Sequence, residues 1–130
     1  MDLLVDVNIL LAVALNEPEK VRIVELTTGA RLVAPDVMPY EIGNALSAMM
    51  KCHRITHEQA QNIFSILNAI PIMLKQVNIA QAIKLSHQFN IYAYDAYYLE
   101  TAQRLRLPLM TLDQQMKSVG QSLNINLLEI

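Results

Sequence analysis

The chain has 130 residues, of which 53% are hydrophobic and 17% charged, and its formal net charge is −2. This length and composition predict one folded domain over residues 1–130 and exclude intrinsic disorder. The near-neutral charge argues against a protein that coats nucleic acid passively, because such proteins are basic overall.

The sequence also predicts in which cellular compartment the protein is found. Its longest unbroken apolar run, Ile9–Leu15, is too short to span a membrane. Asp2 and Asp6 stand where a signal peptide would need basic residues. The single cysteine, Cys52, cannot form an internal disulfide, which is typical of a reducing compartment. We therefore expect a cytoplasmic protein with no membrane segment.

Short apolar runs alternate with helical patterns along the whole chain. We expect strands at 3–5, 31–34, 72–74 and 109–111, and a last strand near 125–128. Between the first two strands we expect helices at 8–15 and 19–28, and after the second a helix at about 36–53 and another after Thr56. Later helices are expected after Asn78, from Asp95 to about Arg106, and as a short helix before the last strand. Strands separated by helices predict parallel βαβ units. The expected fold is α/β, a three-layer α/β/α domain around a central, mostly parallel sheet of about five strands.

Four acidic residues occupy positions that matter in such a fold. Asp6 ends the first strand and Asp113 lies just past the fourth, so both belong to the carboxyl edge of the sheet, where ligands bind. Glu41 lies in the first turns of the long helix, and Asp95 begins a later one. Each also has a purely structural interpretation, because Asp commonly caps helices and Glu complements the helix dipole.

Two considerations favour a site. On a helical wheel Asp95 falls within the apolar stripe of its helix, where a lone carboxylate is costly. Carboxylates that converge repel one another, so one becomes protonated or a cation holds them. A ligand set made only of oxygen selects hard ions such as Mg²⁺ or Mn²⁺. Asn8 and Thr111 could support the acids, although a helix-start residue and a buried strand threonine are equally ordinary interpretations.

Four segments together resemble the signature blocks of the PIN-domain family. The blocks are Asp6-Val7-Asn8, Pro39-Tyr40-Glu41-Ile42-Gly43-Asn44-Ala45-Leu46, Tyr94-Asp95-Ala96-Tyr97-Tyr98-Leu99-Glu100-Thr101-Ala102 and Thr111-Leu112-Asp113. Their order and spacing match over essentially the whole chain, and the small size is most similar to the VapC-type toxins of bacterial toxin–antitoxin modules. One departure is Tyr40, where an aliphatic residue is commoner.

The resemblance implies a Mg²⁺-dependent ribonuclease, in which Mn²⁺ can substitute. It implies that the metal-binding and catalytic acids are Asp6, Glu41, Asp95 and Asp113, supported by Asn8 and Thr111. It also implies an RNA substrate, a cognate antitoxin as partner, and a homodimer.

Two further clusters have competing interpretations. Lys51 and Arg54, with two histidines nearby, could contact RNA phosphates, or form a solvated helix end favoured by the dipole. Four tyrosines could stack on bases, although such a cluster more often packs a core or a subunit interface. They are Tyr92, Tyr94, Tyr97 and Tyr98.

Two other function classes remain open from the sequence. A strand-terminal Asp6 also suits phosphoryl transfer through an aspartyl intermediate, as in haloacid-dehalogenase-like or receiver domains. The first of these families has Asp-x-Asp where this chain has Asp6 and Asn8, and the second places a Lys after a late strand, which this chain lacks. The other class is a non-catalytic, protein-binding PIN-like module, against which the intact set of four acids argues.

Overall fold

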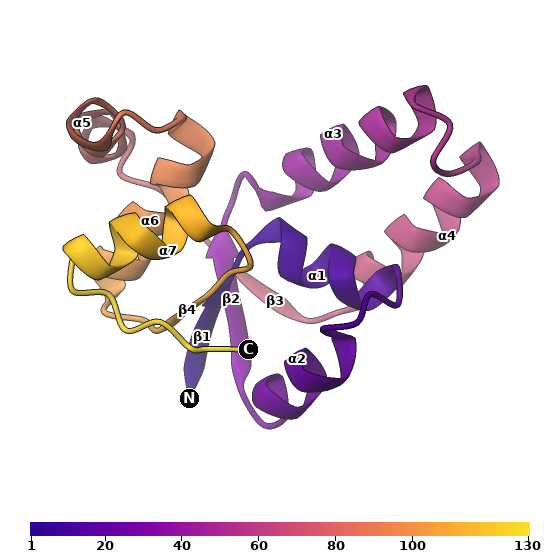
Figure 1. The fold of residues 1–130 in the computed structure, drawn as a ribbon, viewed down its shortest axis with the longest axis horizontal. Helices are drawn as coiled ribbons and strands as arrows, with labels where there is room; N and C mark the ends of the chain where they lie inside the picture. The colour runs from indigo at the N-terminus through magenta and orange to yellow at the C-terminus, as the bar shows by residue number, and fades with distance from the viewer.

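A computed structural model describes every residue from Met1 to Ile130. Four parallel strands form one sheet in the order β3-β2-β1-β4 (Figure 1). The strands are β1 (Asp2–Val5), β2 (Arg31–Pro35), β3 (Ile72–Lys75) and β4 (Leu109–Met110). The register places Leu4 opposite Val33 on one side and Leu109 on the other. Strand β1 is therefore central, which explains why its apolar run is continuous and not alternating.

Seven helices cover the two faces of this sheet. They are α1 (Val7–Ala14), α2 (Lys20–Thr27), α3 (Met38–Lys51), α4 (His57–Asn68), α5 (Ile79–Phe89), α6 (Ala93–Leu105) and α7 (Gln114–Ser122). Figure 1 shows α1 to α4 on one side of the sheet and α5 to α7 on the other, and the contacts among the helices follow the same division. The expected three-layer α/β/α domain with a parallel sheet is confirmed.

The predicted fifth strand is reduced to a single bridge. Leu109 and Leu127 form an isolated parallel pair, and the sheet has four strands where the sequence suggested about five. Its neighbour β4 is only two residues long, so the C-terminal segment finds little backbone to pair with. Gly120 of α7 adds a constraint, because a Cβ there would lie 3.1 Å from the Leu127 side chain.

Local sequence signals explain where the helices begin. The side chains of Asp6, Asn78 and Asp113 each accept a backbone N–H three residues later, and Thr56 with Gln59 forms a capping box. These caps satisfy donors that the first helical turn leaves free. No helix is both long and apolar enough to cross a membrane.

The strand order creates a switch point at the carboxyl edge of the sheet. The chain moves outward from β1 through β2 to β3, then returns across the sheet to β4 beside β1. Helices after β1 and after β4 consequently leave toward opposite faces, which opens a crevice between the ends of these two strands. Asp6 follows β1 directly and Asp113 follows β4 by three residues, so both lie at this crevice.

Candidate active site

Asp6 is held rigidly at the end of β1. It is 3% exposed; its Oδ1 accepts the backbone N–H of Ile9 at 3.1 Å and its Oδ2 accepts the hydroxyl of Thr111. The Thr111 hydroxyl in turn accepts the backbone N–H of Asp113 at 3.0 Å. Asp6 is therefore a helix cap, as its position suggested, but Thr111 also links it to the opposite side of the crevice.

The two later aspartates differ from one another in their local roles. Asp113 caps α7 by accepting the backbone N–H of Met116 at 2.8 Å. Asp95 lies within the first turn of α6, whose N-cap is Tyr92, so neither the cap interpretation of Asp95 nor its placement as the first helical residue is correct. Asp95 is partly buried without that structural duty, which leaves its carboxylate available for another one.

Glu41 is the least satisfied of the four acids. It lies in the first turn of α3, and its Oε1 is sealed from solvent without a hydrogen-bond partner. The pKa of Glu41 is raised to about 7, mainly by burial and also by the charges of Asp6 and Asp95, while contact with Tyr98 opposes the rise. A role limited to complementing the helix dipole would not require this burial.

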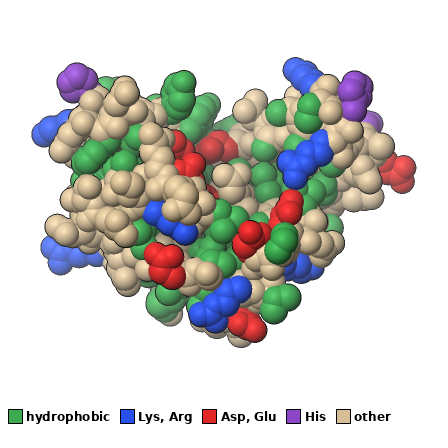
Figure 2. Space-filling view, viewed as in Figure 1, with side chains coloured by type: hydrophobic (Ala, Val, Ile, Leu, Met, Phe, Trp, Pro, Cys, Tyr) green, Lys and Arg blue, Asp and Glu red, His purple; other side chains and the backbone are tan.

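The four acids influence one another electrostatically. Burial raises the pKa of Asp6 to about 6 against the lowering effect of Thr111, and Asp113 adds to the rise. Burial also raises the pKa of Asp95, again with a contribution from Asp113. Residues from four separate elements thus form one acidic cluster, and Figure 2 shows acidic side chains gathered in the hollow between the two halves of the molecule.

The cluster fits a hydrated cation better than a preformed metal cage. No three His, Cys, Asp or Glu side chains anywhere in the chain surround a common point closely enough to hold an ion alone. Mg²⁺ keeps several of its waters and is usually bound through one or two carboxylates. The mutual repulsion of the acids is what a divalent cation would relieve, and a donor set made only of carboxylate oxygens suits a hard cation.

The remaining predicted residues lie around or away from this cluster. Asn8 is exposed in the first turn of α1, and its backbone N–H favours the ionised form of Asp6. Lys51 ends α3, ten residues from Glu41, or about 15 Å along the helix. Arg54 lies beyond it and pairs with Glu17 at 3.3 Å. The structure therefore does not bring Lys51 or Arg54 to the acids, although one cavity of about 290 Å³ is lined by both Asn8 and Arg54.

The four tyrosines divide between core and surface. Tyr98 is 2% exposed and packs beside Glu41, so it has no free face for stacking on a base. Tyr92 and Tyr94 are exposed, and Tyr94 makes an edge-to-face contact with Tyr97 at 5.8 Å between ring centroids.

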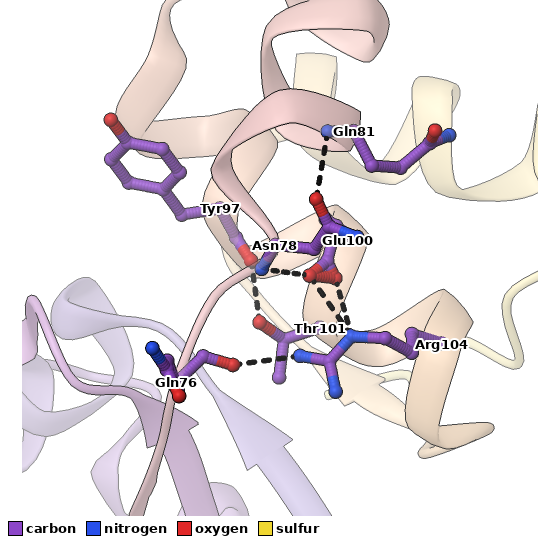
Figure 3. Close-up of polar contacts among 7 residues, drawn as sticks. All are labelled: Gln76, Asn78, Gln81, Tyr97, Glu100, Thr101 and Arg104. Atoms are coloured by element: carbon purple, nitrogen blue, oxygen red, sulfur yellow. Dashed lines mark hydrogen bonds and ion pairs between the residues drawn. The ribbon is translucent and has the colours of Figure 1, made fainter.

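A buried acid outside this cluster was missed by sequence reasoning. Glu100 of α6 is 1% exposed and accepts Arg104 Nε at 3.0 and 3.1 Å and the backbone N–H of Asn78 at 2.7 Å (Figure 3). Arg104 also donates to the backbone oxygen of Gln76 at 2.8 Å. The i, i+4 spacing of Glu100 and Arg104 was the available signal. This group fastens the segment before α5 to α6, and its charge is already neutralised.

Comparison with known proteins agrees with this architecture. The sequence model of the PIN domain matches residues 3–121. No curated protein matches the chain significantly.

Three solved structures share the fold at low sequence identity. PAE2754 from Pyrobaculum aerophilum has a TM-score of 0.71 and 21% identity, over 92% of this chain and 84% of that one. VapBC2 from Rickettsia felis, bound to a DNA fragment from its promoter, has a TM-score of 0.67 and 15% identity, over 98% of both chains. VapC20 from Mycobacterium tuberculosis, a toxin that cleaves the sarcin–ricin loop, has a TM-score of 0.66 and 11% identity, over 91% of this chain and 95% of that one.

Proposed function

The chain belongs to the PIN domain family, and on that premise we propose that it is a Mg²⁺-dependent ribonuclease and the toxin of a VapC-type toxin–antitoxin pair. The observation that carries this proposal is the cluster of four carboxylates, in which burial and the neighbouring acids raise the pKa of Asp6, Glu41 and Asp95. The structural likeness to VapC20, which is described as a toxin that cleaves RNA, supports the same activity.

Each residue of the cluster has a definable task in this proposal. Asp6, Glu41, Asp95 and Asp113 would hold the cation, and Mn²⁺ would serve in place of Mg²⁺. The bound ion would activate water and stabilise the negative charge on the phosphoryl oxygens. Thr111 fixes the orientation of Asp6 through its hydroxyl.

No observation favours phosphoryl transfer through an aspartyl intermediate. A nucleophilic aspartate must expose an oxygen to the phosphorus atom that it attacks. Asp6 is 3% exposed and both its oxygens already accept hydrogen bonds. This arrangement suits a charge that holds a cation and not one that forms a covalent bond.

RNA cleavage by the purified protein is the direct test. We expect cleavage in Mg²⁺ or Mn²⁺, loss of cleavage in EDTA, and recovery when Mn²⁺ is restored. Asp95→Asn should be inactive, whereas the matched control Glu58→Gln, on an exposed face of α4, should cleave normally. Cleavage that persists in EDTA, or an active Asp95→Asn, would contradict a metal-dependent site.

A growth experiment separates the toxin from the nuclease. Expression in the bacterial cytoplasm should slow growth, and co-expression of the protein encoded by the neighbouring gene should restore it if that protein is the antitoxin. The VapBC2 complex among the structural neighbours supports such a partner. Normal growth alongside abundant, active enzyme would rule out the toxin role and leave the nuclease intact.

The proposed homodimer has a candidate surface around β3. This strand is at one edge of the sheet, and Leu74 on it is exposed, as are Tyr40 of α3, Phe64 of α4 and Ile79 of α5. Leu74→Lys should shift the molecular mass in light scattering from dimer to monomer, because an unpaired apolar edge favours association. Val21→Lys, at an exposed apolar position on α2, is the matched control and should leave the mass unchanged.

A further inference from the structure

Tyr98 places a hydrogen-bond donor inside the acidic cluster without giving it a partner. The residue lies on the buried face of α6, is 2% exposed, and its hydroxyl is sealed from solvent and makes no hydrogen bond. A buried hydroxyl without a partner is destabilising, because it has lost its hydrogen bonds to water. An apolar side chain of the same shape would avoid this cost, so packing alone does not account for the hydroxyl.

Three acidic side chains lie near this hydroxyl. They are Glu41, Asp6 and Asp95. A phenol hydroxyl can donate its proton to a carboxylate oxygen. Among the three carboxylates, Glu41 is in direct side-chain contact with it.

Glu41 supplies the matching acceptor. Its Oε1 is the other buried polar side-chain atom in the chain that has no partner, so an unused donor and an unused acceptor are sealed into the same contact. The two groups face each other without reaching hydrogen-bond geometry. A small rotation of the Glu41 side chain would close the bond to Tyr98 and leave its second oxygen to face the crevice.

We propose that Tyr98 is a positioning residue, whose hydroxyl donates to Oε1 of Glu41 and fixes that carboxylate in the orientation that binds a divalent cation. This inference rests on the proposed metal-dependent function and assigns a residue that supports its site. Tyr98 does not touch substrate, because its hydroxyl is sealed. Groups that orient metal ligands typically change metal affinity or activity by about 10- to 100-fold when they are removed.

Calorimetric titration with Mn²⁺ alone, without RNA, tests the proposal. Tyr98→Phe keeps the ring and its packing, so the metal-free variant should melt at or above the temperature of the wild type. Its Kd for Mn²⁺ should rise about tenfold. Tyr97→Phe is the matched control from the same helix, and because Tyr97 lies outside the acidic contact its Kd should be unchanged.

A double-mutant cycle shows whether Tyr98 acts through Glu41. In a Glu41→Gln background, Tyr98→Phe should have little further effect on the Kd for Mn²⁺. An equal tenfold effect in both backgrounds, or wild-type affinity in Tyr98→Phe, would overturn the positioning role while leaving the nuclease proposal in place. A wild type that binds no Mn²⁺ would overturn both.

Discussion

Two regions of this molecule bury carboxylate oxygens but treat them in opposite ways. Glu100 is 1% exposed and meets the guanidinium of Arg104 and a backbone N–H, so its charge is compensated within the fold. Glu41 has a sealed oxygen with no partner, and its nearest charged neighbours are other acids. The charge of the first group is compensated within the fold, whereas the like charges around the second are not.

This difference separates a structural carboxylate from a functional one better than burial does. The attraction within a buried ion pair offsets the cost of removing its charges from water only when hydrogen bonds use the remaining acceptor sites, as they do at Glu100. The cluster at the switch point instead stores repulsion between like charges. Cation binding would relieve that repulsion, so changes in the acidic cluster should affect both stability and activity. Changes in the Glu100–Arg104 group should affect stability alone.

The largest expected contrast is in catalysis. Asp6→Asn removes a charge from the crevice while keeping the shape and one acceptor oxygen for Thr111. We expect RNA cleavage to fall by at least about 100-fold, since even residues that only support metal ligands change activity by 10- to 100-fold. Glu58→Gln should leave the rate unchanged. Normal cleavage by folded Asp6→Asn would remove Asp6 from the site.

In stability the larger effect should come from the region of Glu100 and Arg104. Arg104→Met leaves Glu100 buried without its cation, and breaking a fully buried pair costs about 3–5 kcal/mol. The Arg104 side chain is 40% exposed, so we expect a smaller loss of about 2 kcal/mol and a melting temperature lower by several degrees. Arg22→Met, which breaks the exposed pair with Glu25, is the control and should not change it. Mn²⁺ affinity should be the same in both variants.

Metal addition should shift stability only through the acidic cluster. A ligand that binds the folded state at a hundredfold excess over Kd stabilises it by about 2.7 kcal/mol, which raises the melting temperature of a domain this size by several degrees. Wild type and Glu58→Gln should show this shift with millimolar Mn²⁺. Asp95→Asn should show less of it, and its metal-free form should melt at or above wild type. Equal shifts in all three proteins would mean that the four acids are not the metal site.

Much of this architecture could be predicted from sequence because its signals are local. The cap at Asp6, the capping box at Thr56 and the buried stripe of α3 each depend on neighbours within a few residues. The length of the C-terminal strand could not be predicted, because it depends on how much of β4 remains available for pairing.

The identities of the candidate acids followed from their positions at strand ends and helix starts, but their interactions did not. The contact between Tyr98 and Glu41 joins α6 to α3, and the bond from Asn78 to Glu100 spans 22 residues. Helical periodicity placed Tyr98 on a buried face without showing that its hydroxyl would point at a carboxylate. Sequence reasoning also left Lys51 and Arg54 open as either RNA contacts or a solvated helix end, because their distance from Glu41 along α3 is known only once the helix is placed.

The remaining expected effect is the pH dependence of the metal-free protein. The pKa of Asp6 is about 6 in the folded state, against 3.8 for the ordinary side chain, and that of Glu41 is about 7 against 4.5. The folded protein therefore binds more protons than the unfolded chain between about pH 4 and pH 7, and its stability rises as pH falls through this window. For Asp6 the full change is at most about 3 kcal/mol, at 1.36 kcal/mol per pKa unit.

Melting in EDTA from pH 8 to pH 5 measures this dependence. The wild type should gain stability toward pH 5, and Asp6→Asn should gain less because one of the shifted groups is gone. Saturating Mn²⁺ should reverse the trend, because a bound cation favours the ionised carboxylates and is lost as they become protonated. A slope that Asp6→Asn left unchanged would show that Asp6 is not one of the groups responsible for the pH dependence.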